Sequence, residues 1–320
     1  MICFPNAKIN IGLHIISRRE DGYHNIETVF YPIGLKDALE IVPTCTDEIS
    51  ASTSPDVPFP ADNNNVRFAN AGSGLTTRTA EPGEPGEPGE EPMLSLPYRF
   101  FQTGNVIQGN EADNLVIKAL KLISTEKEIP PVNIHLLKKI PLGAGLGGGS
   151  SDAAFMLRLL NNNFRLGYSD KELMQLAARL GADCSFFIHN RPAFAGGIGD
   201  LLEPIKLDLT SWFLLLVKPD VVVNTKEAYA MITPRHPELS LKEIVKKPVT
   251  EWRGLMKNDF ESPVFKKYPE ICRIKQQLYD LGAVYASMSG SGSSVYGFFH
   301  SEPDLKGMFS NHFVWTNKEL

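Results

Sequence analysis

The segment from Pro141 to Asp152 carries the clearest chemical pattern in the 320-residue sequence. It reads Pro-Leu-Gly-Ala-Gly-Leu-Gly-Gly-Gly-Ser-Ser-Asp, and five of its residues are glycine. Glycine loses much conformational freedom on folding, so such a cluster usually marks a place where the backbone passes close to a ligand. Backbone N–H groups in a loop of this kind bind anions such as phosphate. A glycine-rich turn without a ligand is the alternative.

The residues on either side of this loop predict a strand before it and a helix after it. Residues 132–137 alternate as a strand does. After the loop, apolar residues recur at helical spacing at Ala153, Met156, Leu157 and Leu160. Ser150 or Ser151 is predicted to be the N-cap. The unpaired N–H groups and the positive dipole end of the helix would then favour an anion at the loop.

Two common phosphate loops match this segment only in part. A Walker A loop ends in Gly-Lys-Ser/Thr, whereas Gly149 is followed directly by Ser150. The dinucleotide fingerprint fits loosely from Gly143 to Gly148, but it requires an acidic residue about 20 positions later, at the end of a second strand. Asp170 is near that distance but lies in a predicted helix start. We therefore expect a phosphate loop of another type.

Composition predicts a globular protein of about two domains. The chain is 42% hydrophobic and 22% charged, with a net charge of −5. This gives no basic surface for nucleic acid, and no window approaches the ~18 apolar residues of a membrane span. Four widely spaced cysteines and an N-terminus without a signal-peptide pattern predict a cytoplasmic location. Residues 44–96, which contain repeated Gly-Glu-Pro triplets, are predicted to be a flexible acidic insertion.

Two segments near the N-terminus carry further polar side chains. Residues 7–15 alternate as a strand, with Ile9, Ile11, Leu13 and Ile15 on one face and Lys8, Asn10, Gly12 and His14 on the other. The polar face either lines a site or lies in solvent. The turn signal Asp21-Gly22 is followed by Tyr23 and His24. These two residues either form a binding element or are a loop aromatic beside a surface histidine.

Two later segments also leave a choice between structure and chemistry. Asp183 follows the predicted end of a helix and precedes an apolar pair, so it either caps the next turn or acts as a base. Residues 289–294 form a second glycine–serine loop between two predicted strands. This loop either faces a ligand or is a flexible turn.

In chain order, these segments resemble the motifs of the GHMP kinase superfamily, which includes galactokinase, homoserine kinase, mevalonate kinase and phosphomevalonate kinase. The matching segments are Pro5 to Asn10, Pro141 to Asp152, Gly181 to Asp183, and Ser289 to Ser293. The element from Arg18 to His24 is similar to that of the members whose acceptor alcohol carries a cytidine diphosphate. The resemblance covers nearly the whole chain outside residues 44–96.

The resemblance implies an α+β fold with ATP and acceptor in a cleft between two domains. Residues 1–205 would form a ribosomal-protein-S5-domain-2-like domain, and residues 206–320 a ferredoxin-like domain. The implied reaction is ATP-dependent phosphorylation of the 2-hydroxyl of 4-diphosphocytidyl-2-C-methyl-D-erythritol, in the non-mevalonate isoprenoid pathway, with Mg²⁺ accompanying ATP. Phosphorylation of homoserine or mevalonate is the alternative within the superfamily.

The resemblance also implies roles for individual residues. Lys8 and Asp183 would be catalytic, and Asn114 and Lys138 would lie near the adenosine. Tyr23 and His24 would hold the cytosine. Asn10 would also touch the acceptor, and Tyr229 would stack on the other face of the base. The ATP phosphates would be bound by Pro141, Leu142, Gly143, Ala144, Gly145, Leu146, Gly147, Gly148, Gly149, Ser150 and Ser151. No metal ligands are predicted.

Other classes of protein fit the sequence less well. A nucleotide-binding regulator without catalysis is disfavoured because Lys8 and Asp183 are both present. A dinucleotide-dependent oxidoreductase is disfavoured because the acidic partner of its fingerprint is missing. We expect a small-molecule substrate and no nucleic acid or membrane partner. The sequence leaves the oligomeric state open, with a homodimer as one alternative.

Overall fold

The computed structural model describes residues 1–44, 98–105, 107 and 109–318. The predicted acidic insertion of residues 44–96 lies, apart from Thr44, outside these described residues. Within the described ranges, no helix combines the length and the apolar character that crossing a membrane requires.

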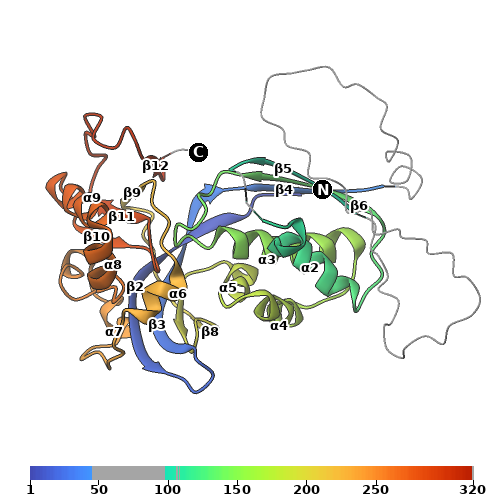
Figure 1. Ribbon diagram of the computed structural model, residues 1–320, viewed down its shortest axis with the longest axis horizontal. Coiled ribbons are helices and arrows are strands. Elements are labelled where there is room, and N and C mark those ends of the chain that lie inside the picture. The colour runs from blue at the N-terminus through green and yellow to red at the C-terminus, as the bar shows by residue number, and fades with distance from the viewer. Residues whose placement is uncertain (45–97, 106, 108, 319–320) are drawn as a thin grey trace, which may run out of the picture.

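A long antiparallel hairpin forms the middle of the fold. Strand β2 (Asn6–Arg18) pairs with β3 (His24–Lys36), and the predicted Asp-Gly turn lies between them. The sheet continues through β7 (Ala193–Gly196) and β8 (Leu201–Pro204), in the order β2-β3-β7-β8. Figure 1 shows the hairpin, in blue, between the orange and red C-terminal elements and the green helices.

A bulge at Gly12 changes which core the alternate side chains of β2 pack in. The pairing register shifts between Ile11 and Leu13, and Gly12 has a φ of +69°, a conformation that favours glycine. Ile9 and Ile11 pack in one core cluster, whereas Leu13 and Ile15 pack in another. The prediction that these four side chains share one face is therefore wrong, because strict alternation ends at the bulge.

A second sheet supports the glycine loop. Its order is β1 (Ile2–Cys3), β4 (Ala38–Pro43), β6 (Val132–Lys138) and β5 (Tyr98–Gly104), with β5 parallel to β6. Its core lies against helices α2 (Leu115–Ser124), α3 (Gly148–Phe164), α4 (Asp170–Leu180) and α5 (Cys184–His189). The 3₁₀ helix η1 (Glu111–Asp113) precedes α2. Figure 1 shows the four helices grouped beside this sheet.

Local sequence signals predicted several boundaries of these elements. The sequence from Ser169 to Glu172 has the pattern of a capping box, and these two residues form one at the start of α4. Asn114 caps α2 by accepting the N–H of Val116. The apolar pattern from Leu35 to Val42 favours a single strand, but the structure divides these residues between two strands. Asp37 separates β3 from β4, and β4 pairs with β1 and β6 instead of β2.

The C-terminal elements form a third, antiparallel sheet in the order β10-β11-β9-β12. Its strands are β9 (Phe213–Lys218), β10 (Tyr285–Met288), β11 (Val295–Phe299) and β12 (Phe313–Thr316). The accompanying helices are α6 (Thr225–Ala230), α7 (Leu241–Ile244), η2 (Val249–Glu251), α8 (Glu261–Lys267) and α9 (Pro269–Asp280). The sequence from Pro219 to Tyr229 favours a simple connection, whereas the structure has α6 in this region. The boundary between residues 205 and 206 stays a prediction.

Candidate active site

Lys8 and Asp183, the predicted catalytic residues, lie side by side. The Nζ of Lys8 is 3.2 Å from Oδ2 of Asp183 and 2.5 Å from Oδ1 of Asn10. It also lies 4.5 Å from the ring centroid of Phe30. The Lys8 side chain is buried, whereas the Asp183 side chain is 34% exposed. Asp183 is therefore the member of the pair that a substrate can reach.

Asp183 occupies the N-cap position of α5, but its side chain makes no capping hydrogen bond. The capping alternative is therefore wrong, and the carboxylate remains available for the Lys8 ion pair. Its charge also reaches the ring of Tyr229. Burial raises the pKa of Tyr229 to about 12, and the negative charge of Asp183 adds to this rise.

The glycine loop passes directly beside Lys8. The backbone N–H of Lys8 donates to the carbonyl of Leu146, with an N–O distance of 3.0 Å. Gly147 has a φ of +69°, and a Cβ there would lie 3.1 Å from Cε of Lys8 and 3.0 Å from Cζ of Phe187. The close approach of the loop to the lysine therefore depends on glycine at this position.

The N-terminus of α3 has no side-chain cap. Gly147 is its N-cap residue, and Ser150 and Ser151 lie inside the helix, so the predicted serine cap is wrong. The first N–H groups of a helix have no acceptor within the helix, so they remain available to an anion. The Oγ of Ser151 is buried and has no hydrogen-bond partner among the described residues.

The second glycine–serine loop packs against the first. Ser289 Oγ donates to the carbonyl of Gly145 at 2.8 Å and accepts the N–H of Asn10 at 3.1 Å. The N–H of Ser294 donates to the carbonyl of Ala144 at 3.2 Å. These contacts tie the loop to the predicted phosphate loop. The alternative of a flexible hairpin turn does not fit them.

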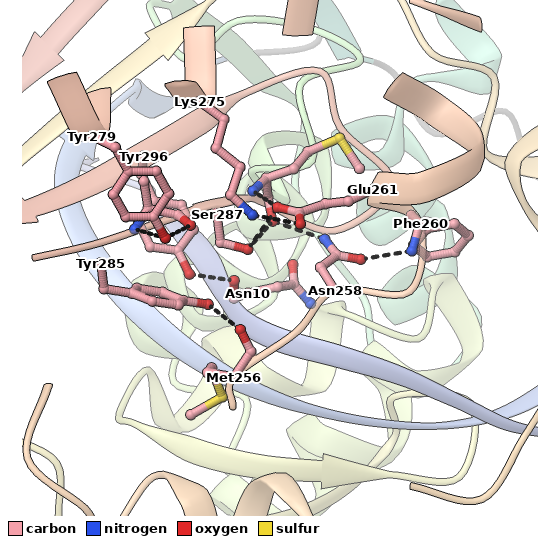
Figure 2. Close-up of polar contacts among 12 residues, drawn as sticks. Asn10, Met256, Asn258, Phe260, Glu261, Lys275, Tyr279, Tyr285, Ser287 and Tyr296 are labelled. Carbon is pink, nitrogen blue, oxygen red and sulfur yellow. Dashed lines mark hydrogen bonds and ion pairs between the residues drawn. The ribbon is translucent and has the colours of Figure 1, made fainter. Parts of the chain in front are cut away.

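Two side chains that the sequence analysis missed hold this second loop in place. The Nδ2 of Asn258, a buried residue, donates to the carbonyls of Met288 and Gly290, each at 2.8 Å. Glu261 accepts the N–H of Met288 at 2.9 Å and the ammonium of Lys275 at 2.6 Å. Figure 2 shows the side chains of Asn258, Glu261 and Lys275 near Ser287, in the strand that leads into the loop. Neither Asn258 nor Glu261 belongs to a sequence motif that would have revealed this role.

Asn10, a predicted acceptor-binding residue, has partners on every side. Its Oδ1 accepts from Lys8, and its Nδ2 donates to the hydroxyl of Thr28 at 3.0 Å. Its carbonyl accepts the hydroxyl of Tyr296 at 2.9 Å, a bond drawn in Figure 2. Asn10 therefore orients Lys8 in this structure, and its contact with the acceptor stays a prediction.

Of the three predicted cytosine-binding residues, Tyr23 lies in the turn between β2 and β3, His24 begins β3, and Tyr229 lies in α6. The rings of His24 and Tyr229 stack at 4.9 Å with an interplanar angle of 18°, and Tyr229 meets Phe260 edge-on. Tyr23 is 61% exposed. Burial lowers the pKa of His24, and the positive charge of Arg18 lowers it further. A neutral imidazole is therefore favoured at neutral pH.

Asn114 and Lys138 are both committed to protein contacts. Asn114 uses Oδ1 to cap α2, and Lys138 is 1% exposed. The Lys138 ammonium contacts the carboxylates of Asp37 and Asp152. A direct contact between Lys138 and adenosine would require this cluster to open. That contact is not supported by the geometry, and it stays a prediction.

Two cavities lie near these elements. One of about 480 Å³ borders the start of the glycine loop at Pro141 and Leu142. The other, of about 320 Å³, is lined by His14 with Arg235 and Asp259. His14 therefore lines a cavity that includes neither Lys8 nor Asn10. In the described part of the chain, no three His, Cys, Asp or Glu side chains are grouped so as to hold a metal ion.

Comparison with known families defines the class of this protein. The family described as GHMP kinases N terminal domain matches residues 114–191, and the family described as GHMP kinases C terminal matches residues 240–311. The first match contains the glycine loop and Asp183, and the second contains the loop at Ser289. The fold is thus the two-domain α+β fold of GHMP kinases, as the sequence predicted.

Comparison with individual proteins narrows the class. A 4-diphosphocytidyl-2-C-methyl-D-erythritol kinase of Parabacteroides distasonis is 48% identical, over 99% of both chains. The kinase of the same name from Bacteroides thetaiotaomicron is 50% identical, over 95% of this chain and 94% of the relative. A crystal structure of 4-(cytidine 5'-diphospho)-2C-methyl-D-erythritol kinase superposes with a TM-score of 0.70 and 28% identity, covering 99% and 98% of the two chains. The chain belongs to the 4-diphosphocytidyl-2-C-methyl-D-erythritol kinase family of GHMP kinases.

Proposed function

We propose that this protein transfers the γ-phosphate of ATP to the 2-hydroxyl of 4-diphosphocytidyl-2-C-methyl-D-erythritol, in the non-mevalonate route to isoprenoid precursors. The observation that carries the proposal is the Lys8–Asp183 pair, 3.2 Å apart, beside an uncapped helix N-terminus in a glycine loop. The names of relatives that are up to 50% identical support this acceptor over homoserine or mevalonate.

The glycine loop is proposed to bind the triphosphate of ATP. Its residues Pro141 to Ser151 would direct backbone N–H groups at the phosphate oxygens, and the dipole of α3 adds positive potential there. The absence of a side-chain cap on α3 supports this, because the N-cap residue, Gly147, has no side chain to accept the first N–H groups of the helix. Such fixed donors need little reorganisation during the reaction.

Asp183 is proposed to act as the general base. Its partly exposed carboxylate would take the proton of the acceptor hydroxyl while the hydroxyl oxygen forms a bond to the γ-phosphorus. The bond between that phosphorus and the bridging oxygen of ADP breaks in the same step. Lys8 would hold the Asp183 carboxylate in place through their ion pair and would neutralise charge that builds up on the phosphoryl group.

Recognition of the cytosine is proposed to fall to Tyr23, His24 and Tyr229. Flat aromatic rings provide stacking, and a neutral imidazole provides one donor and one acceptor for the edge of the base. The direct stack of His24 on Tyr229 supports their nearness to a common ligand. It also means that a base between these two rings would first have to separate them.

The remaining proposals concern Mg²⁺, compartment and assembly. Mg²⁺ is proposed to accompany ATP and to be held largely by the phosphates, since kinase sites use few protein ligands for it. Asp183 offers a partly exposed carboxylate of the right chemistry, but we assign no ligand. We further propose a cytoplasmic enzyme. The protein is either a monomer or a homodimer, and its molar mass measured by light scattering would distinguish the two.

The direct test is a transfer assay with three acceptors. The protein is mixed with ATP, Mg²⁺ and either 4-diphosphocytidyl-2-C-methyl-D-erythritol, mevalonate or homoserine, and ³¹P NMR follows the products. The proposal expects ADP and a new phosphomonoester with the cytidylyl alcohol alone. Transfer to mevalonate or homoserine, with none to the cytidylyl alcohol, would overturn it.

A further inference from the structure

A buried cluster of three ionisable residues joins the two ends of the glycine loop. Asp37, Lys138 and Asp152 are each at most 2% exposed. Asp37 lies between β3 and β4, Lys138 is the last residue of β6, and Asp152 is in α3. This cluster is therefore separate from the Lys8–Asp183 pair of the candidate active site.

Asp37 fixes the chain where it enters the loop. Its Oδ1 accepts the backbone N–H of Lys139 at 2.6 Å and that of Ile140 at 2.8 Å. These are the two residues directly before Pro141. The N–H of Asp37 donates to the carbonyl of Pro5 at 2.8 Å, so the same residue is anchored to the segment that leads into β2.

Lys138 connects this entry point with the helix that follows the loop. Its Nζ contacts Oδ2 of Asp37 and lies 2.7 Å from Oδ2 of Asp152. A Cβ on Gly148 would lie 3.3 Å from the same Nζ and 2.9 Å from Cγ2 of Ile140. The glycine at the start of α3 therefore sits directly over the ammonium group.

We propose that Asp37, Lys138 and Asp152 form a loop clamp, a set of positioning residues that holds the two ends of the glycine loop at the separation a triphosphate requires. The clamp rests on the proposed function for the identity of its ligand. The three residues act through the loop backbone and do not touch the reacting atoms. This role is separate from the adenosine contact of Lys138, which stays a prediction.

The charges of the clamp favour a geometric role. Burial raises the pKa of the Asp152 carboxyl to about 8; the Lys138 ammonium opposes this rise and the charge of Asp37 adds to it. Near neutral pH the protonated form of the Asp152 carboxyl is therefore favoured, so Asp152 adds little negative charge to the cluster. Buried ion pairs often add little net stability over apolar residues of similar volume, so we assign this cluster a role in its directed contacts to the loop ends.

The first test separates the link to α3 from the rest of the cluster. Asp152→Ala removes that link and leaves the Asp37–Lys138 pair intact, whereas Asp152→Asn keeps an oxygen that accepts from the ammonium. We expect Asp152→Ala to weaken binding of a non-hydrolysable ATP analogue by about 100-fold, as for a misplaced binding group. The affinity of Asp152→Asn for the same analogue should remain within about twofold of that of the original chain. Both should bind the cytidylyl alcohol normally, by calorimetry.

A second variant tests the lysine without leaving an unpaired buried charge. In Lys138→Met with Asp37→Asn, the new amide oxygen still accepts the N–H groups of Lys139 and Ile140. We expect this double variant to have a melting temperature near that of the original chain. Its affinity for the ATP analogue should nevertheless fall, as in Asp152→Ala. Hydrogen exchange of residues 143–149 should be faster. Lys171→Met, an exposed lysine in α4, is the matched control for the lost charge and should change nothing.

The outcomes separate the clamp from the function it serves. If the original chain binds no ATP analogue, the proposed function fails and the clamp fails with it. If the original chain binds the analogue and folded Asp152→Ala binds it equally well, the clamp alone is overturned. Equal losses of nucleotide and acceptor affinity, or recovery of nucleotide affinity in the double variant, would also overturn it by indicating a purely structural cluster.

Discussion

Ser289 and Gly145 join two loops that lie far apart in the sequence. The Oγ of Ser289 donates to the carbonyl of Gly145 at 2.8 Å, and a Cβ on Gly145 would lie 2.0 Å from the carbonyl oxygen of Ser289. The C-terminal elements thus shape the glycine loop directly. The loop follows β6 and precedes α3, and Ser289 belongs to the turn between β10 and β11.

Gly145→Ala should separate these two loops. Alanine would be strained at the φ of +72°, and its Cβ would clash with the backbone of Ser289. Gly167→Ala is the matched control, since its φ is +81° but nothing lies within 4 Å of its Cβ position. Both should lose about 1–2 kcal/mol for the left-handed conformation. Only Gly145→Ala should lose most of its ATP affinity in calorimetry, and similar affinities in both variants would contradict this account.

Asp183→Asn should abolish most turnover while ATP still binds. The amide keeps the size of the carboxylate but cannot accept the hydroxyl proton, and a positioned general base contributes about 10²–10⁴-fold. Steady-state kinetics should show a loss of kcat in that range. Calorimetry should show nucleotide affinity close to that of the original chain. Near-normal turnover of the variant would remove Asp183 from its proposed role.

Tyr23→Ala should affect the acceptor far more than ATP. Tyr23 is 61% exposed, so its removal should leave the folded core unchanged. Loss of one stacking ring should raise the acceptor KM by about tenfold, consistent with ~1–3 kcal/mol per stacked base. Phe4→Ala, another exposed aromatic at 54%, is the control. Equal changes in both KM values of Tyr23→Ala would count against the proposed cytosine contact.

Asp152 should give the protein a stability that falls with rising pH. The folded pKa of this carboxyl is about 8, whereas an unfolded aspartate titrates near 3.8. Between these values the unfolded chain releases the proton and the folded chain keeps it, so the contribution of Asp152 to the unfolding free energy declines as pH rises. This contribution of Asp152 is fully present below the pKa of the unfolded chain, near 3.8, and it is lost once the pH exceeds the folded pKa of about 8.

Asp152→Asn removes this titration and provides the measurement. Urea unfolding of both proteins at about pH 5 and about pH 8 should show the variant gaining stability relative to the original chain as pH increases. A difference that is the same at both pH values would show that Asp152 does not hold a buried proton over this range.

The sequence predicted the parts of the site that depend on local signals. The alternation of residues 132–137, the glycine cluster and the helical spacing from Ala153 onward gave a strand, loop and helix in their observed order. The capping box at Ser169 was equally local. The motif resemblance brought Lys8 and Asp183 together, which neither residue implies by itself.

The rest depended on contacts between distant segments. Lys138 ends a strand whose neighbours do not reveal that its ammonium is buried between Asp37 and Asp152. The bulge at Gly12 interrupts a pattern that otherwise alternates cleanly. Asn258 belongs to no motif, because a buried amide that serves two carbonyls can come from any nearby segment.

The most direct test of the account is the position of the acceptor hydroxyl in a crystal structure with a non-hydrolysable ATP analogue and 4-diphosphocytidyl-2-C-methyl-D-erythritol. The account predicts that the triphosphate lies on the backbone of residues 143–149. It also predicts that the 2-hydroxyl oxygen lies about 2.6–3.2 Å from a carboxylate oxygen of Asp183. A triphosphate bound elsewhere, or a hydroxyl out of reach of both Asp183 and Lys8, would contradict it.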